Sequence, residues 1–214
     1  MKIRMICVMA ALAVIVGGCG TKPSEPAAAP KQEGMTLMQA LKERKTTREF
    51  SSKEIPADVL MELLWAADGI NRPELTQHNR TAPSAMDMQE VDIYVAKADG
   101  LYLYDAKAPA LTKVLPDDIR AATGTQGFVK DAPVNLVFVA DYSRMRNNLS
   151  EKDKDFYSAA DTGYISQNVY LYCASAGLAT VVRGLVDRAA LAKAMNLRPD
   201  QKIILAQTIG YPKE

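Results

Sequence analysis

The residues best suited to chemistry lie in one short segment, Arg44-Lys45-Thr46-Thr47-Arg48-Glu49-Phe50. Arg44 and Arg48 offer planar guanidinium groups, Lys45 offers a point charge and Thr46 offers a hydroxyl. A phosphate monoester requires donors of these kinds. Cations are also common at the C-terminal ends of helices, so on charge alone a solvated helix end is an equal alternative.

A second polar segment, Arg80-Thr81-Ala82-Pro83-Ser84-Ala85, leads into Asp87 and Gln89. Proline and serine at these positions are typical of a turn. Taken together, the two segments indicate a protein that binds a phosphate-bearing cofactor.

Two helices must position the first segment. Apolar residues recur at helical spacing over residues 35–45, with Thr36 as the N-cap. A second apolar helical face covers residues 56–68, with a proline at its start and a glycine after its end. Residues 70–83 are then expected to form a loop.

The rest of the chain mixes strand and helix signals without the regular alternation of a parallel sheet. Alternating apolar residues predict strands, Gly100 predicts a hairpin turn, and the apolar run at 134–140 is typical of a buried central strand. The predicted strands are 91–95, 101–105, 134–140, 177–182 and 203–210, and the predicted helices are 111–120, 154–176 and 187–195. The expected fold class is α+β, with helices flanking a mainly antiparallel central sheet.

The N-terminal residues have the pattern of a lipoprotein signal peptide. Lys2 and Arg4 precede an apolar run over residues 6–16 that is too short to span a bilayer. Val16-Gly17-Gly18-Cys19 then resembles a lipobox, which predicts cleavage after residue 18 and lipidation of Cys19. An ordinary signal peptide with a chance cysteine is the alternative.

The domain organisation follows from this pattern. Residues 1–18 are the signal peptide, residues 19–34 form a lipidated, flexible tether rich in Pro and Ala, and residues 35–214 form one globular domain. The expected location is the bacterial cell envelope, with a lipid anchor to a membrane and the domain facing the periplasm or the exterior.

Composition excludes several other functions. Loss of residues 1–18 lowers the basic count from 26 to 24 against 25 acidic residues, so a nucleic-acid-binding face is not expected. With Cys19 lipidated, Cys173 is left without a disulfide partner and is expected to be a small buried apolar residue. His78 is the single histidine, so neither a metal site nor a Ser-His-Asp triad is expected. Flavin stacking is one interpretation of six tyrosines, but most of them are expected to be packing residues of strands and helices with their hydroxyls at the surface. They are Tyr94, Tyr102, Tyr104, Tyr164, Tyr170 and Tyr172.

Four segments, in this order and at this spacing, resemble the nitroreductase-like FMN-dependent oxidoreductases. They are Arg44–Phe50, Pro83-Ser84-Ala85-Met86-Asp87-Met88-Gln89, Ala176-Gly177-Leu178-Ala179-Thr180 and Ile209-Gly210-Tyr211-Pro212. The resemblance is strongest to the branch of thiazoline and oxazoline dehydrogenases, where Gly69-Ile70-Asn71-Arg72, Arg80–Ala85 and the Gly100–Asp105 hairpin have counterparts. It covers nearly everything from Met35 onward.

The resemblance implies FMN as the cofactor and assigns residues to it. Arg44, Lys45 and Arg48 would bind the phosphate and the pyrimidine side of the flavin, with a hydroxyl contact from Thr46. The other subunit would place Pro83, Ser84 and Ala85 against the edge of the isoalloxazine ring. Gln126 or Thr125 would contact the ribityl chain or the ring edge. Val182, Arg183 and Gly184 match a turn whose backbone amide points toward flavin N5.

Two positions depart from the family pattern. Asp87 stands where many members have asparagine, and a carboxylate cannot donate a hydrogen bond unless it is protonated. Many relatives also continue into a tail with a late cation on the phosphate, whereas this sequence stops at Glu214 and is expected to offer only Lys213 as a weak substitute. Phosphate binding is therefore expected to depend more heavily on Arg44, Lys45 and Arg48.

The implied activity is ping-pong electron transfer through a flavin at a homodimer interface, without a catalytic side chain. The substrate, a small molecule or a peptide, is unknown, and the long helix at 154–176 is expected to lie at the dimer interface. NAD(P)H is a cytoplasmic donor, which conflicts with export. Either the donor is a membrane or extracytoplasmic carrier, or the domain has lost turnover. The alternatives to an enzyme are a membrane-tethered flavin- or ligand-binding lipoprotein without turnover, and a structural envelope lipoprotein with a degenerate pocket.

Overall fold

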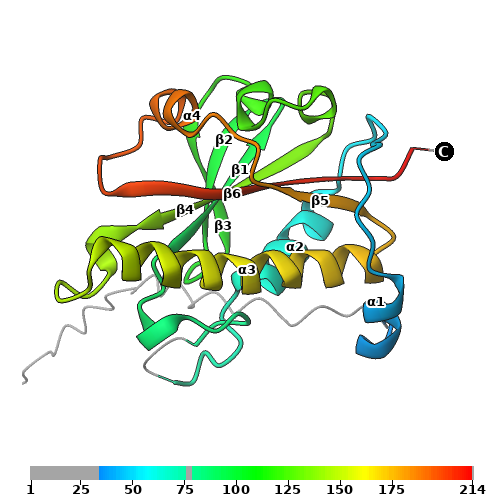
Figure 1. Cartoon of the computed structure of the whole chain (residues 1–214). Helices are drawn as coiled ribbons and strands as arrows, with labels where there is room; N and C mark the ends of the chain where they lie inside the picture. Colours follow the sequence, from blue (N-terminus) through cyan, green and yellow to red (C-terminus); the bar gives the residue numbers. More distant parts are fainter. Residues whose placement is uncertain (1–33, 76–78, 214) are drawn as a thin grey trace, which may run out of the picture.

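The computed structural model describes residues 34–75 and 79–213. Its centre is a six-stranded sheet with the strand order β3-β2-β1-β4-β6-β5, in which every neighbouring pair is antiparallel (Figure 1). The strands are β1 (Val91–Lys97), β2 (Gly100–Asp105), β3 (Ala110–Leu115), β4 (Val134–Asp141), β5 (Ala179–Arg183) and β6 (Gln201–Gly210). The predicted α+β class with a mainly antiparallel sheet is confirmed.

Four α-helices accompany the sheet in the described residues. They are α1 (Leu37–Glu43), α2 (Ala57–Asp68), α3 (Glu151–Ser175) and α4 (Arg188–Ala194). The long helix α3 crosses one face of the sheet, and α4 lies at the far end from α1 (Figure 1). Short 3-10 turns occur at Ala85–Asp87, Arg120–Thr123, Gly127–Val129 and Tyr142–Arg144.

Alternation along the strands separates two cores. In β1, Ile93 and Val95 join the core formed with α2 and α3, whereas Tyr94 joins the core formed with α4. All eight residues of β4 are buried, as its uninterrupted apolar pattern predicts for a central strand. The sheet therefore has helices on both faces.

Local capping explains why several elements begin and end where they do. Thr36 forms a capping box with Gln39 at the start of α1, and the Asp187 side chain accepts a hydrogen bond from Ala190 N–H at the start of α4. After α3, Gly177 adopts a φ of 67°, and Leu178 N–H donates back to the Cys173 carbonyl at 2.8 Å. These predicted caps are present.

One predicted element is wrong. Residues 111–120 were expected to be helical, but Ala110–Leu115 form strand β3, which pairs with β2. Thr112 and Val114 are β-branched, and Pro116 prevents the segment from continuing as a helix. The decisive factor is the free edge of β2, which local spacing does not reveal.

The other boundaries differ less. α3 begins at Glu151 rather than residue 154, and β5 extends to Arg183 rather than ending at residue 182. Cys173 is buried in the α2–α3 core, as expected. The predicted signal peptide, Cys19, nearly all of the tether and His78 lie outside the described residues.

Candidate functional site

The cationic segment runs along the edge of the sheet. It leaves α1 at Arg44, whose backbone turns out of the helix. Thr47 N–H then donates to the Thr180 carbonyl of β5 at 3.1 Å, and Phe50 forms a β-bridge with Pro212. β5 is the last strand of the sheet, so its outer edge is available for these contacts.

Tyr170 of α3 joins this segment to β5. Its hydroxyl shares a hydrogen bond of 3.1 Å with Thr46 Oγ1 and accepts one of 3.0 Å from Val182 N–H. The Arg44 guanidinium carbon lies 5.3 Å from the centre of the Tyr170 ring, within the range of a cation–π contact. Tyr170 is only 7% exposed, so it is an exception to the expectation that most tyrosine hydroxyls lie at the surface.

The cations of the segment have no opposing carboxylates among residues 34–75 and 79–213. Arg44 is partly buried, and Lys45 and Arg48 are exposed. None of the three forms an ion pair with a described residue. Cations without partners are suited to an anion such as a phosphate ester, so this donor set fits the phosphate end of FMN.

The end of β5 supplies a backbone donor beside these cations. Val182 and Arg183 lie in the strand itself rather than in the expected turn, which begins at Gly184. Tyr170 already occupies Val182 N–H, whereas Gly184 N–H donates to no described residue. A Cβ at Gly184 would meet, within the described chain, only Leu205 Cδ2, at 3.9 Å. The space around this amide is therefore open to a ligand.

Arg183 points away from that space into a buried polar network. Its guanidinium donates to Thr123 O at 2.7 Å, to Thr208 Oγ1 at 3.0 Å and to Asn135 Oδ1 at 3.1 Å. Burial lowers the pKa of Arg183 to about 10, which leaves it charged at neutral pH.

Gln126 lies in the loop that covers this network. The neighbouring Gly124 packs against Arg183, and Phe128 packs on Phe50 with ring centres 5.6 Å apart. The buried Gln126 Oε1 has no hydrogen-bond partner in the described part of the chain. An orphaned acceptor at this place fits a contact with a ligand. Thr125 is exposed on the same loop.

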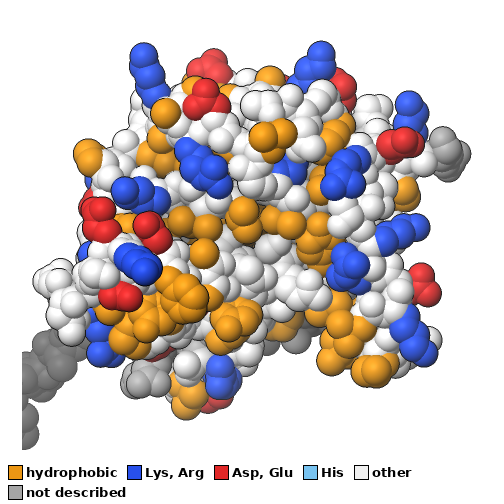
Figure 2. Space-filling view, in the orientation of Figure 1, with side chains coloured by type: hydrophobic (Ala, Val, Ile, Leu, Met, Phe, Trp, Pro, Cys, Tyr) orange, Lys and Arg blue, Asp and Glu red, His pale blue; other side chains and the backbone are white. Residues whose placement is uncertain are grey.

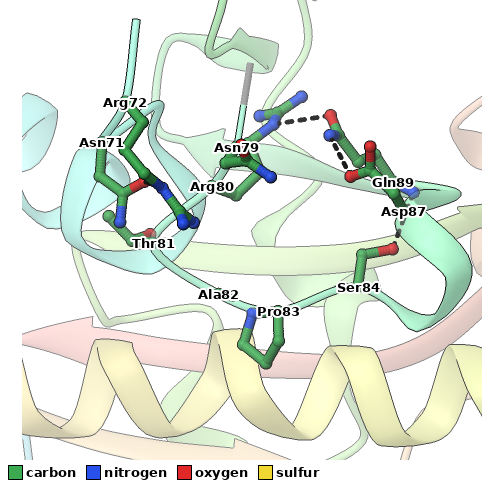
Figure 3. Close-up of a pocket in the computed structure, with 10 residues that line it drawn as sticks. All are labelled: Asn71, Arg72, Asn79, Arg80, Thr81, Ala82, Pro83, Ser84, Asp87 and Gln89. Atoms are coloured by element: carbon green, nitrogen blue, oxygen red, sulfur yellow. Dashed lines mark hydrogen bonds between the residues drawn. The ribbon is translucent and has the colours of Figure 1, made fainter. Parts of the chain in front are cut away.

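The Pro83–Gln89 segment lines a pocket of about 430 Å³. Figure 3 shows Asn71 and Arg72 on one side of this pocket and Asp87 and Gln89 on the other. The pocket is lined by Asn71, Arg72, Asn79, Arg80, Thr81, Ala82, Pro83, Ser84, Asp87 and Gln89. Met86, Asp87 and Gln89 have φ values of 53°, 55° and 49°, and strained backbone of this kind is often retained at functional sites.

Charges in this pocket are compensated by a chain of hydrogen bonds. Arg80 donates to Asp68 Oδ2 at 3.3 Å and to Gln89 Oε1 at 3.0 Å, and Gln89 Nε2 donates to Asp87 Oδ1 at 2.8 Å (Figure 3 draws the last two). Burial raises the pKa of Asp68 to about 7, and the Arg80 guanidinium opposes that shift. Asp87 is thus held as an acceptor, so it does not supply the hydrogen-bond donor that asparagine would offer at this position.

The two clusters lie at different positions along α3. Ala85 N–H donates to Asp161 Oδ2 at 2.8 Å, whereas Thr46 contacts Tyr170. Asp161 and Tyr170 are nine residues apart on one helix, a separation of about 14 Å at 1.5 Å per residue. One copy of the chain therefore brings together Arg44, Lys45, Thr46, Arg48, Gln126, Val182, Arg183 and Gly184, and holds Pro83, Ser84, Ala85 and Asp87 elsewhere.

Comparison with known proteins identifies the family. The model described as "Nitroreductase family" matches residues 41–211. The chain belongs to the nitroreductase family. MJ1384 of Methanocaldococcus jannaschii, which is assigned to the nitroreductases, is 30% identical over 166 residues, covering 72% of this chain and 81% of its own. Nitroreductase-family proteins typically bind FMN and form homodimers.

Solved structures of the nitroreductase family agree with the fold. A protein of Ralstonia eutropha JMP134 assigned to the nitroreductases is 44% identical, with a TM-score of 0.80 over 91% of this chain and 88% of its own. A nitroreductase-like protein of Desulfovibrio desulfuricans, crystallised with FMN, is 23% identical, with a TM-score of 0.60 over 83% and 87% of the two chains.

Two further observations bear on other functions. Within residues 34–75 and 79–213, no helix combines the length and apolar character needed to cross a bilayer. The same residues contain no group of three or more His, Cys, Asp and Glu side chains arranged to bind a metal ion.

Proposed function

We propose that this protein is an FMN-dependent oxidoreductase whose flavin sites lie between two copies of the chain. The observation that carries the proposal is the set of unpaired cations Arg44, Lys45 and Arg48 along the edge of β5, beside the open amide of Gly184. The FMN found in the Desulfovibrio relative and the family's typical cofactor both support it.

The residues divide the work of holding the cofactor. Arg44, Lys45 and Arg48 bind the phosphate, and Thr46 adds a hydroxyl that Tyr170 orients. Gly184 N–H donates toward the redox-active edge of the ring, and Gln126 Oε1 accepts from a ring or ribityl donor. FMN supplies the redox chemistry when it is bound.

A second copy of the chain supplies the remaining contacts in this proposal. Pro83, Ser84 and Ala85 of one copy would lie against the ring held by the other, because a single copy keeps these two clusters about 14 Å apart along α3. Asp87, held by Gln89, would then present an acceptor.

Exposed apolar side chains indicate the face where the second copy docks. Leu37, Met38 and Leu41 of α1 are 63%, 64% and 45% exposed, and Phe156 and Tyr164 of α3 are 68% and 50% exposed. Figure 2 shows hydrophobic side chains over both helices on this face. Burying them against an identical surface gives a two-fold dimer with two equivalent sites.

Absorbance of the purified full-length chain in detergent tests the proposal. We expect a yellow protein that bleaches with dithionite or NADPH and reoxidises with an acceptor. Yellow but redox-inert protein would favour a tethered flavin-binding lipoprotein without turnover, for which export away from NAD(P)H is the supporting argument. A colourless protein that does not take up added FMN would leave only a structural envelope role.

We also propose a cellular location for this protein from its N-terminal sequence. The lipobox at Val16–Cys19 supports a lipid-anchored protein of the bacterial cell envelope, facing the periplasm or the exterior. Labelling with radioactive palmitate should mark the wild type and not Cys19→Ala. Labelling of both proteins would contradict the lipidation of Cys19.

Three segments of the chain support a proposal for the substrate class. Gly69–Arg72, Arg80–Ala85 and the Gly100–Asp105 hairpin resemble the thiazoline and oxazoline dehydrogenase branch, which supports oxidation of a ring in a small molecule or peptide. Oxidation of a thiazoline model compound, compared with reduction of a nitroaromatic compound, would distinguish this branch from the rest of the family.

A further inference from the structure

Arg183 is an unusual arginine because its buried charge faces only neutral groups. Its side chain belongs to a residue that is 3% exposed, and its donors reach Thr123, Asn135 and Thr208. No described carboxylate forms an ion pair with it, and burial of the guanidinium lowers its pKa.

Several other arginines of this protein form ion pairs with carboxylates. Arg80, Arg120 and Arg144, whose side chains are 14%, 16% and 38% exposed, pair with Asp68, Asp118 and Asp92 respectively. These are the usual arrangements, since a buried charge is costly unless an opposite charge compensates it. Hydrogen bonds to neutral groups therefore do not by themselves explain why a charged residue is buried at position 183.

A purely structural role does not require the charge. The guanidinium ties β5 to β4 and β6 through Asn135 and Thr208, and to the covering loop through Thr123. Neutral amides form such ties in many protein cores. The covering loop lies so close to Arg183 that a Cβ at Gly124 would overlap Arg183 Nη1. The loop therefore encloses the guanidinium on the side of Gly124.

The position of the Arg183 charge next to the proposed flavin site can explain why it is present. Arg183 lies between Val182 and Gly184, the two residues that border the proposed flavin site. Its guanidinium also contacts the loop that carries the orphaned Gln126 Oε1. In a protein interior, where the effective dielectric constant is low, a fixed charge acts strongly on ligands it does not touch.

We propose that Arg183 is a fixed positive charge that stabilises the reduced, anionic form of the flavin over the oxidised form in the adjoining site. This inference rests on the proposed function. A hydride donor that loses two electrons and one proton to the flavin leaves the flavin with one additional negative charge, and this charge is what Arg183 favours. Arg183 is a positioning residue in this role, since it acts through the field and through Val182–Gly184.

The test compares Arg183→Gln with Arg183→Lys in the full-length, FMN-loaded protein. Both changes shorten the side chain, but only lysine keeps the charge. The measurement is the midpoint potential of bound FMN, obtained by titration with dithionite. We expect Arg183→Gln to weaken the binding of reduced FMN about tenfold more than that of oxidised FMN, which lowers a two-electron potential by about 30 mV, and Arg183→Lys to retain most of the wild-type value.

Asn135→Asp provides a second route if Arg183→Gln does not fold. It keeps the arginine and places a carboxylate at the atom that accepts from Arg183 Nη2 at 3.1 Å. We expect it to lower the potential in the same direction as Arg183→Gln. Arg144→Gln is the matched control, since Arg144 lies beyond the opposite end of β4 and its loss should leave the potential unchanged.

The outcomes separate this inference from the proposed function. Wild-type protein that binds no FMN overturns both. Wild-type protein that binds FMN, with an unchanged potential in Arg183→Gln or Asn135→Asp, overturns the role of Arg183 alone. Equal shifts in Arg183→Gln and Arg183→Lys would assign the effect to packing, and they would also overturn the electrostatic role.

Discussion

The two halves of the candidate site treat charge in opposite ways. At the edge of β5, Arg44, Lys45 and Arg48 have no carboxylate partners in the described chain, and Arg183 of β5 is buried among neutral groups. In the Pro83–Gln89 pocket, Arg80 is compensated by Asp68. An end with excess positive charge is suited to hold an anion, whereas a compensated and strained wall is suited to define shape.

This difference indicates how a flavin would be shared between two chains. In the proposed site, the cationic end would supply binding free energy, because charged hydrogen bonds to a phosphate are strong. In the proposed dimer, the pocket of the partner would supply orientation, because Arg80, Gln89 and Asp87 are already linked to each other by hydrogen bonds. The comparison can be tested by changing each half separately.

Replacing a cation at the β5 edge should have the largest effect. Arg44→Ala should weaken FMN binding by about 1.5–3 kcal/mol, the size of a hydrogen bond to a charged group. Fluorescence titration of apoprotein with FMN measures the change. Lys42→Ala is the control, because Lys42 lies in the last turn of α1, outside the cationic segment. Equal affinities for wild type and Arg44→Ala would remove Arg44 from the site.

The compensated half should instead show a pH-dependent stability. Because Asp68 has a folded pKa of about 7 against an ordinary value of 3.8, its neutral form favours the folded state. That stabilisation is complete below pH 3.8 and is lost as pH rises through 7, at up to about 1.4 kcal/mol per pH unit.

Urea denaturation at several pH values between 4 and 8 measures this effect. Asp68→Asn should flatten the pH dependence without abolishing it, since burial also raises the pKa values of Glu90, Asp92 and Asp161. Identical slopes for the wild type and Asp68→Asn would contradict the assignment.

Removing one hydroxyl should loosen the β5 edge by a smaller amount. Tyr170→Phe leaves Val182 N–H without its acceptor and frees Thr46, which should reduce the free energy of unfolding by about 1–2 kcal/mol. Tyr164→Phe, at an exposed position of the same helix, should have little effect. A Tyr170→Phe protein as stable as the wild type would show that this hydroxyl does not hold the edge together.

The smallest effect is expected at Asp87. Asparagine can still accept from Gln89 Nε2, so Asp87→Asn should change FMN affinity by less than about 1 kcal/mol. The same titration that tests Arg44 measures it. A loss of FMN affinity as large as that of Arg44→Ala would contradict the proposed difference between the two halves, because it would show that the pocket also contributes binding free energy.

Much of the fold was predictable because the relevant signals are local. The Thr36 and Asp187 caps, the glycine after α3 and the alternating residues of β1 each act within a few residues of the chain. Strand β3 was missed because its formation depends on the free edge of β2, which is a partner and not a local pattern.

The sequence by itself determined which chemical groups are present and which local elements carry them: a cationic segment after a capped helix, a polar turn, and a long helix. Only the tertiary structure decided which of these meet. Tyr170 reaches Thr46 across 124 positions of sequence, and Arg183 lies in a strand among Thr123, Asn135 and Thr208. Such contacts depend on strand order and helix placement, which result from burying the whole core and leave no periodic trace in any one segment.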